Sequence, residues 1–138
     1  MRRIFFLCTG NSCRSQMAEG FMRNMAGNKF EVYSAGVEPT GINPHAIKVM
    51  AEIEIDISFH KSKSVNKFLK QEFDYVITVC NHAKQICPIF PGQHEKIHWD
   101  IEDPANAKGS ERERLAFFRK IRDEIKEKTL KFLDKLSC

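Results

Sequence analysis

The sequence contains no long hydrophobic run. Its opening apolar stretch, Ile4 to Leu7, follows Arg2 and Arg3 and ends at Cys8. It is much shorter than the apolar part of a signal peptide, and shorter still than the roughly 20 residues of a membrane-spanning helix. We therefore expect a soluble protein that stays in the cytoplasm and has no membrane partner.

Repeats, low-complexity tracts and linkers rich in Pro, Gly or Ser are also missing. The 138 residues, 42% of them hydrophobic and 29% charged, fit one globular domain, 1–138, that buries its own core. The formal net charge of +4 is a mild excess. Because no basic stripe interleaved with aromatic residues accompanies it, nucleic-acid binding is poorly supported, and a small anionic substrate suits the charge better. We expect a monomer.

The cysteines lack the short Cys-x-x-Cys pairs of structural zinc sites, although Cys80, His82, Cys87, His94 and His98 lie in one region. We expect neither a metal nor another cofactor. In a reducing cytoplasm the five cysteines are also poor candidates for structural disulfides. Their spacing is therefore better explained by catalysis, with buried structural cysteines as the alternative.

Hydrophobic periodicity predicts alternating strands and helices. Strands are expected at Arg3–Leu7, Glu31–Ala35, Phe73–Val79 and Glu95–His98. Helices are expected from Ser15 with Met17, Phe21 and Met25 on one face, from Asn43-Pro44 through about Ile53, and after Ser110 with Leu115, Phe118, Ile121, Ile125, Phe132 and Leu136 on one face. This order predicts an α/β fold, a short parallel sheet of about four strands with helices on both faces. Ligands of such sheets bind at the carboxyl ends of the strands.

The loop after the first predicted strand is a candidate anion site, with the sequence Cys8-Thr9-Gly10-Asn11-Ser12-Cys13-Arg14-Ser15. Backbone N–H groups of a short loop at a helix N-terminus hold a tetrahedral oxyanion, and Arg14 adds a permanently charged fork. The same surroundings are expected to lower the pKa of Cys8. Ser15 is expected to bond the sulfur, and Asn11 the backbone of the loop. The alternative is a buried cysteine beside a helix-capping serine.

The stretch from Cys8 to Gly20 resembles the signature of the low-molecular-weight tyrosine phosphatase superfamily. Within it, the chain is most similar to the thioredoxin-coupled arsenate reductases. The similarity extends over Val32–Gly36, Gly41–Pro44, Ile55–Ser58, the cysteine pair, His98-Trp99, Asp103–Ala105, Phe117-Phe118 and Arg122–Ile125. The resemblance implies a phosphatase-like fold, Cys8 as nucleophile, arsenate as substrate with phosphate or sulfate as competing anions, and a role in arsenic detoxification.

The resemblance also implies a redox relay through Cys80 and Cys87. Cys80 follows a predicted strand, which puts it on the same sheet edge as Cys8. Attack of Cys80 on the Cys8 sulfur, and then of Cys87 on Cys80, would move a disulfide away from the loop, with thioredoxin as final reductant. The segment Asn81 to Pro91 is then expected to change conformation. Cys13 is expected to be a packing residue first and a fallback thiol second, and Cys138 to have no role.

Asp103 is the expected general acid. The following Pro104 keeps it out of the helical conformation, and the resemblance selects it over Asp100 and Glu102. A turn-forming Asp-Pro remains the alternative. The phosphatases usually continue with tyrosine, whereas this chain has Ala105, which favours a reductase. A low-molecular-weight tyrosine phosphatase that uses Cys8, Arg14 and Asp103 alone is the alternative function.

Some related reductases hold a potassium ion near the loop. Three of its ligand positions match Asn11, Glu19 and Ser34, and the fourth corresponds to Lys63. A lysine at that position is expected to take the place of the cation and to pair with Glu19. The alternative is that Lys63 points into solvent.

Overall fold

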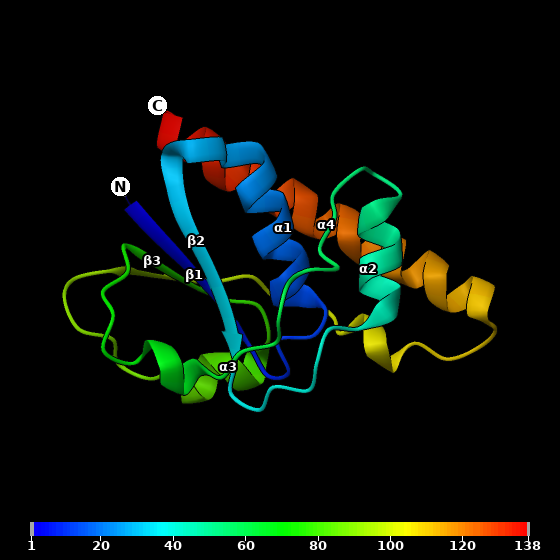
Figure 1. Ribbon diagram of the computed structural model, residues 1–138, viewed down its shortest axis with the longest axis horizontal. Helices are drawn as coiled ribbons and strands as arrows, with labels where there is room; N and C mark the ends of the chain where they lie inside the picture. The colour runs from blue at the N-terminus through cyan, green and yellow to red at the C-terminus, as the bar shows by residue number, and fades with distance from the viewer. Residues whose placement is uncertain (1, 138) are drawn as a thin grey trace.

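The computed structural model describes residues 2–137, and it contains a four-stranded parallel sheet with the strand order β2-β1-β3-β4 (Figure 1). The strands are β1 Arg2–Cys8, β2 Phe30–Gly36, β3 Tyr75–Thr78 and β4 Glu95–His98. The predicted α/β fold and sheet are confirmed. The strand expected over Phe73–Val79 is shorter than predicted.

Four α-helices and three short 3-10 helices accompany the sheet. The α-helices are α1 Arg14–Ala26, α2 Pro44–Ala51, α3 Asn81–Ile86 and α4 Glu111–Ser137, and the 3-10 helices are Gly27–Lys29, Val65–Phe68 and Pro104–Asn106. The three longer α-helices were predicted, although α2 ends before Ile53. The short helix α3 was not predicted. It lies by the arrowheads of β1 and β2, at the carboxyl end of the sheet (Figure 1).

Side-chain caps explain where two helices begin. Asn43 accepts a hydrogen bond from the His45 N–H at 2.8 Å, and Pro44 is the first residue of α2. Before α4, Ser110 and Glu113 each accept from the other's backbone N–H at 3.2 Å, which forms a capping box. Helix caps of this kind can be predicted from the sequence, because the residues involved are close together in the chain.

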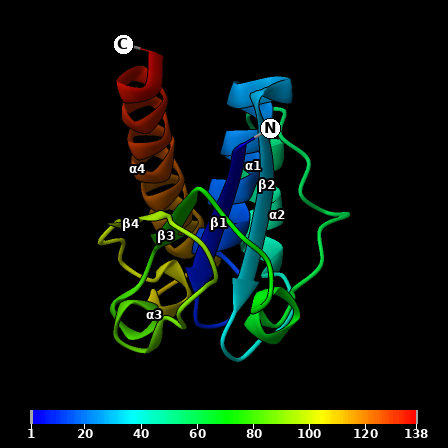
Figure 2. The same ribbon diagram turned by 90° about the vertical axis from the view of Figure 1, so that its left-hand side faces the viewer.

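Strand β1 lies in the middle of the sheet, and its residues Ile4 to Leu7 are fully buried. A continuous apolar run is expected where both faces of a parallel strand are covered. On one face, α1 packs against β1 and β2, and α4 packs against α1 and, further along, α2 (Figure 2). On that face Phe6 contacts Trp99, which meets Phe132 of α4.

The opposite face is covered by short segments rather than by long helices. Phe5 points to this side and contacts the rings of Phe68, Phe73 and Phe90 at centroid distances of 5.3, 4.8 and 5.3 Å. Phe68 comes from the 3-10 helix Val65–Phe68. The aromatic cluster therefore covers this face of the sheet with side chains from loops and from a short 3-10 helix.

Within residues 2–137, every helix falls short of the combined length and apolar character that a membrane crossing requires.

Candidate active site

The loop between β1 and α1 is held from outside by the segment that follows β2. Backbone N–H groups of that segment bond the loop's carbonyl oxygens: Val37 to Cys8 at 3.2 Å, Glu38 to Thr9 at 2.8 Å, Thr40 to Gly10 at 3.0 Å and Asn43 to Ser12 at 3.1 Å. In the opposite direction, the Asn11 N–H points at the Cys8 sulfur at 3.1 Å. The loop is thus fixed through its carbonyl oxygens, and the Asn11 N–H is left facing the Cys8 sulfur.

Gly36 allows this close approach. A Cβ atom at Gly36 would stand 2.5 Å from the Thr9 oxygen and 2.7 Å from the Asn11 nitrogen, both of them backbone atoms. Real Cβ atoms do not approach backbone atoms so closely. The end of β2 must therefore be glycine if the loop is to keep its shape.

The sulfur of Cys8 lies at the bottom of the loop, and the residue is 2% exposed. Ser15 Oγ lies 2.8 Å from it, as predicted. Burial raises the pKa of the Cys8 thiol above its ordinary value, so the predicted lowering is wrong for this loop. The hydrogen bonds from Ser15 and the Asn11 N–H, and after them the charge of Arg14, act to lower the pKa and favour the thiolate.

Asn11 organises the rear of the loop with its side chain. Its amide nitrogen donates to Ser15 Oγ at 2.8 Å and to Ser34 Oγ at 3.0 Å, and its amide oxygen accepts from the Lys63 N–H at 2.8 Å. The expectation that it bonds the loop's own backbone is therefore wrong. Asn11 also has a positive φ of 49°, which asparagine tolerates better than most residues.

Arg14 and Asp103 face one another across the mouth of the loop. The Arg14 guanidinium donates to the Ile101 carbonyl oxygen at 3.0 Å, and its other nitrogen lies 3.5 Å from Asp103 Oδ2. Asp103 is extended, with φ −77° and ψ 112°, as expected before Pro104. The side chain of Asp103 is 32% exposed and that of Arg14 is 13% exposed. A carboxyl group accessible to solvent thus stands beside a half-buried cation.

Cys80 reaches the loop from the end of β3. Its sulfur lies 3.4 Å from Thr9 Oγ1 and caps α3 by accepting from the Ala83 N–H, also at 3.4 Å. Cys80 is 5% exposed. The expected juxtaposition of Cys80 with the anion loop is therefore present, through Thr9.

Cys87 lies at the other end of α3, half-buried, with its sulfur 3.6 Å from the Pro88 oxygen. Burial raises the pKa of Cys87, and nearby Lys96 opposes the rise. The seven-residue step from Cys80 spans about 10 Å at helical rise. Bridged cysteines have Cα atoms roughly 4.4–6.8 Å apart, so α3 must unwind before these two can be joined.

Cys13 is placed for packing. It is 4% exposed within the main core, and its sulfur is 3.9 Å from Ser12 Oγ. Burial raises its pKa to about 12, so almost none of it is thiolate at neutral pH. Cys8, Cys13, Cys80 and Cys87 are all free. Cys138 lies outside the described residues.

Lys63 lies where it was expected. Its Nζ is 3.9 Å from Glu19 Oε1 and donates to the Lys61 carbonyl oxygen at 2.8 Å, while Ser34 Oγ donates to the same Glu19 oxygen. The predicted pairing with Glu19 is confirmed. Burial lowers the pKa of Lys63, and Glu19 acts against that lowering.

Two residues of the site, Gln16 and Ile101, were not predicted from the sequence. The Gln16 amide nitrogen donates to Asn11 Oδ1 at 3.0 Å and to the Lys61 oxygen at 3.0 Å, and its oxygen lies 3.0 Å from His60 Nδ1. The position of Gln16 next to Ser15 could have indicated that its side chain lies close to the loop. The other residue, Ile101, holds Arg14 through its carbonyl, and a backbone oxygen leaves no mark in the residue pattern.

The histidine region does not assemble a metal site. His94 and His98 are four residues apart, yet among residues 2–136 no group of three or more His, Cys, Asp or Glu side chains is placed to hold an ion. His98 Nδ1 instead lies 2.8 Å from Thr78 Oγ1, a bond between neighbouring strands.

Comparison with known proteins identifies the family of the chain. The family model for low molecular weight phosphotyrosine protein phosphatases matches residues 3–138. The chain belongs to this family. A solved low molecular weight protein tyrosine phosphatase from T. tengcongensis has the same fold, with a TM-score of 0.79 at 27% identity over 98% of this chain and 99% of that one. The predicted superfamily is confirmed.

Several members of the family that resemble this chain are arsenate reductases. The arsenate reductase of Halalkalibacterium halodurans is 49% identical over 95% of this chain and 94% of its own length, and that of Bacillus subtilis is 46% identical with the same coverage. A solved arsenate reductase in the phosphate-binding state superposes with a TM-score of 0.84 at 35% identity, covering 98% of both chains.

Proposed function

We propose that this protein reduces arsenate to arsenite in the cytoplasm, using Cys8 as nucleophile and Cys80 and Cys87 as resolving thiols. The observation that carries the proposal is the contact between Cys80 and Thr9, since it puts a further thiol beside an anion loop that already has its own nucleophile. The whole-length similarity to arsenate reductases supports the choice of substrate.

Binding comes first. The backbone N–H groups of Thr9 to Ser15 and the Arg14 fork hold the tetrahedral anion, and phosphate or sulfate competes for the same donors. The Cys8 thiolate attacks arsenic and forms the S–As bond. One arsenic oxygen leaves as water, with a proton supplied by Asp103, whose carboxyl stands 3.5 Å from Arg14. No electron has moved at this stage.

Reduction takes place at the sulfur. The Cys80 thiolate attacks the Cys8 sulfur, the new S–S bond forms, and the S–As bond breaks with its electron pair passing to arsenic. Arsenic leaves as arsenite, two electrons richer, and the Cys8–Cys80 disulfide carries the oxidation. Cys87 then attacks the Cys80 sulfur, which releases Cys8 as thiolate and completes the Cys80–Cys87 disulfide.

A dithiol protein of the thioredoxin class is the proposed final reductant. The side chains that flank Cys87 suit a protein partner, because Ile86 is 46% exposed and Ile89 is 87% exposed. A related solved structure is that of a thioredoxin-dependent arsenate reductase from Corynebacterium glutamicum, with a TM-score of 0.74 and 26% identity over 99% of this chain and 62% of that one.

The second candidate is hydrolysis of phosphoesters. The family itself favours it, because Cys8, Arg14 and Asp103 form a complete phosphatase set. A phosphocysteine on Cys8 would be hydrolysed by water, with no use for Cys80 and Cys87.

One pair of assays separates the candidates. Arsenate-dependent NADPH oxidation with thioredoxin and its reductase is measured beside hydrolysis of an aryl phosphate. A reductase consumes NADPH only when arsenate is present, and Cys8→Ser lowers both activities by about a thousandfold or more, since the nucleophile is common to both. Aryl phosphate hydrolysis without arsenate-dependent NADPH oxidation would reject the proposal in favour of the phosphatase.

A further inference from the structure

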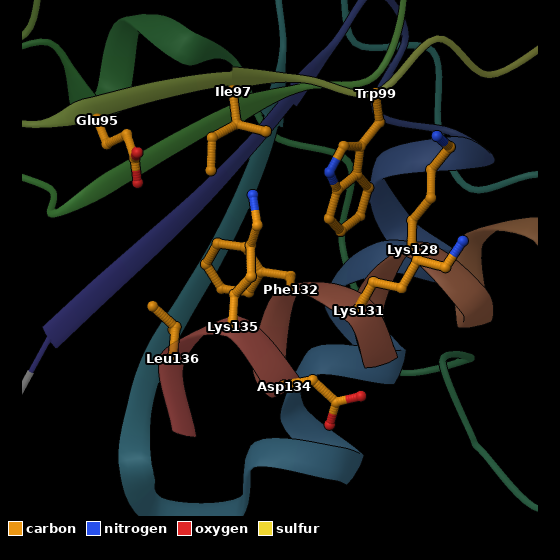
Figure 3. A pocket seen from close by; sticks show the side chains of 9 residues that line it. All are labelled: Glu95, Ile97, Trp99, Lys128, Lys131, Phe132, Asp134, Lys135 and Leu136. Atoms are coloured by element: carbon orange, nitrogen blue, oxygen red, sulfur yellow. The ribbon is translucent and has the colours of Figure 1, made fainter. Parts of the chain in front are cut away.

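A hollow lies between β4 and the last turns of α4, and no residue of the loop lines it. We call it the α4–β4 groove. Its volume is about 680 Å³, and it is lined by Glu95, Ile97, Trp99, Lys128, Lys131, Phe132, Asp134, Lys135 and Leu136 (Figure 3). None of these residues belongs to the proposed reaction. The volume is within the roughly 300–1,000 Å³ typical of small-molecule sites.

The wall of the groove on the sheet side is apolar. Ile97 and Trp99 alternate with His98 and point from the strand toward α4, where Phe132 lies across from them (Figure 3). The rings of Trp99 and Phe132 stand edge to face with centroids 6.5 Å apart. β4 is the outermost strand on its side of the sheet in residues 2–137, so the groove opens at the edge of the sheet. Trp99 and Phe132 are 7% and 8% exposed, so the groove offers a flat apolar group the edges of these two rings.

The wall on the helix side is basic. Lys128, Lys131 and Lys135 follow one another at three- and four-residue steps, so they share one face of α4, and all three line the groove. Lys131 lies 3.9 Å from Glu127, whereas the ion pairs found within the described residues include neither Lys128 nor Lys135.

The acidic side chains of the lining do not cancel this charge at Trp99. In Figure 3 the Asp134 carboxylate points away from Trp99, and Glu95 lies at the far end of the groove, beyond Ile97. In the same view Lys128 extends beside Trp99, and the Lys135 ammonium lies beneath Ile97, so positive groups face the apolar wall at two places. An occupant needs a flat apolar body with a negative group at its edge.

We propose that the α4–β4 groove binds a small aromatic anion, whose ring packs against Trp99 and Phe132 while its carboxylate or sulfonate meets Lys128. Charge complementarity carries the choice of an anion. Lys128 is half-buried, lines the groove and extends beside Trp99 (Figure 3). The site is separate from the loop at Cys8.

The test uses naphthalene-1-sulfonate as the probe and the single tryptophan as the reporter. The Trp99 indole N–H gives one nitrogen–proton NMR resonance, which is expected to shift saturably during titration. The uncharged analogue 1-naphthalenemethanol is expected to bind about twofold to fivefold more weakly, the worth of one exposed charge contact. Inorganic sulfate alone is expected to leave the resonance unmoved.

Matched variants locate the charge. Lys128→Gln and Lys135→Gln are each expected to weaken binding about twofold to fivefold. Lys126→Gln, which makes the same charge change on the exposed side of α4, is expected to leave the affinity unchanged. Cys8→Ser is expected to bind the probe normally.

Four outcomes would each overturn the proposal. They are no saturable shift of Trp99, equal affinity for the uncharged analogue, equal weakening by Lys126→Gln, and loss of binding in Cys8→Ser, which would assign the probe to the anion loop.

Discussion

Two neighbouring strands, β1 and β3, each lead to a cysteine at the carboxyl end of the sheet: β1 ends at Cys8, and Cys80 lies two residues after β3. The chain holds these two cysteines in very different ways. Cys8 lies in a loop whose carbonyls are tied to the segment 37–43, at the bottom of a buried network. Cys80 begins a helix of six residues, and the chain after it exposes Ile86 and Ile89 to solvent. An anion site needs hydrogen-bond donors that are held in place, whereas the transfer of a disulfide needs a segment whose local unfolding costs little free energy.

Removing a thiol from either end of α3 has the largest expected effect. Cys80→Ser or Cys87→Ser is expected to end multiple-turnover arsenate reduction, because the disulfide can no longer leave the loop, while aryl phosphate hydrolysis is spared. The measurement is the steady-state rate of each reaction. Cys13→Ser is the matched control, with turnover retained because this buried thiol is proposed to pack rather than react. Normal arsenate turnover by either variant would refute the relay.

Oxidation is expected to have the next largest effect, and to change the α3 segment but not the loop of Cys8. Mild oxidation is expected to yield a Cys80–Cys87 disulfide and to unwind α3, since the helix keeps the two residues too far apart. Hydrogen exchange should then accelerate by about tenfold or more at the Lys84 amide, which bonds the Cys80 oxygen at 3.1 Å.

The Met17 amide, bonded to the Cys13 oxygen at 2.9 Å, is the internal control and should keep its protection. Peptide mapping identifies the bond. A Cys8–Cys13 disulfide with α3 intact would favour the phosphatase.

Within the fixed region, Ser15→Ala should act through the pKa of Cys8. Its hydroxyl is the largest influence that lowers this pKa, so its removal raises the pKa further and leaves less thiolate at neutral pH. A hydrogen bond to a charged group is worth about 1.5–3 kcal/mol, which predicts alkylation of Cys8 about tenfold slower or more at pH 7.

The pH at half-maximal alkylation should move upward, followed by mass spectrometry of the Cys8 peptide. Ser12→Ala is the control, since Ser12 bonds Cys13 rather than Cys8. An unchanged pH profile in Ser15→Ala would show that the hydroxyl does not tune the nucleophile.

The smallest effect is expected at Lys63. Because its ammonium already lies beside Glu19, exchanging potassium for a large inert cation at constant ionic strength should leave the Tm of the wild type unchanged. Lys63→Asp should lower the Tm in potassium-free buffer and make it recover with potassium. Lys67→Asp, an exposed residue with the same charge change, should gain no such response. Potassium-specific stabilisation of the wild type would contradict the substitution of the cation by lysine.

Local chemistry explains what the sequence could predict. The strand β1, the loop after it and the caps at Asn43 and Ser110 depend on neighbouring residues, so their pattern is visible along the chain. Helix α3 was missed because its six residues have no apolar periodicity and because its cap is a cysteine sulfur rather than an oxygen.

Long-range contacts explain what it could not. The bond from Arg14 to the Ile101 carbonyl and the contacts of Gln16 with Lys61 and His60 join segments far apart in the chain. The pKa of Cys8 followed the same rule, since the sequence shows its hydrogen-bond donors but not the depth of its burial.

The missing side chain at Gly36 bears on protein engineering. Because a Cβ atom there would fall 2.5 Å from the Thr9 oxygen, the loop is shaped as much by the strand beside it as by its own residues. A designer who transplants Cys8–Ser15 alone onto another parallel sheet should obtain a loop that is forced open. The segment to transplant is the end of β1 with its loop, together with the end of β2 and its Gly36.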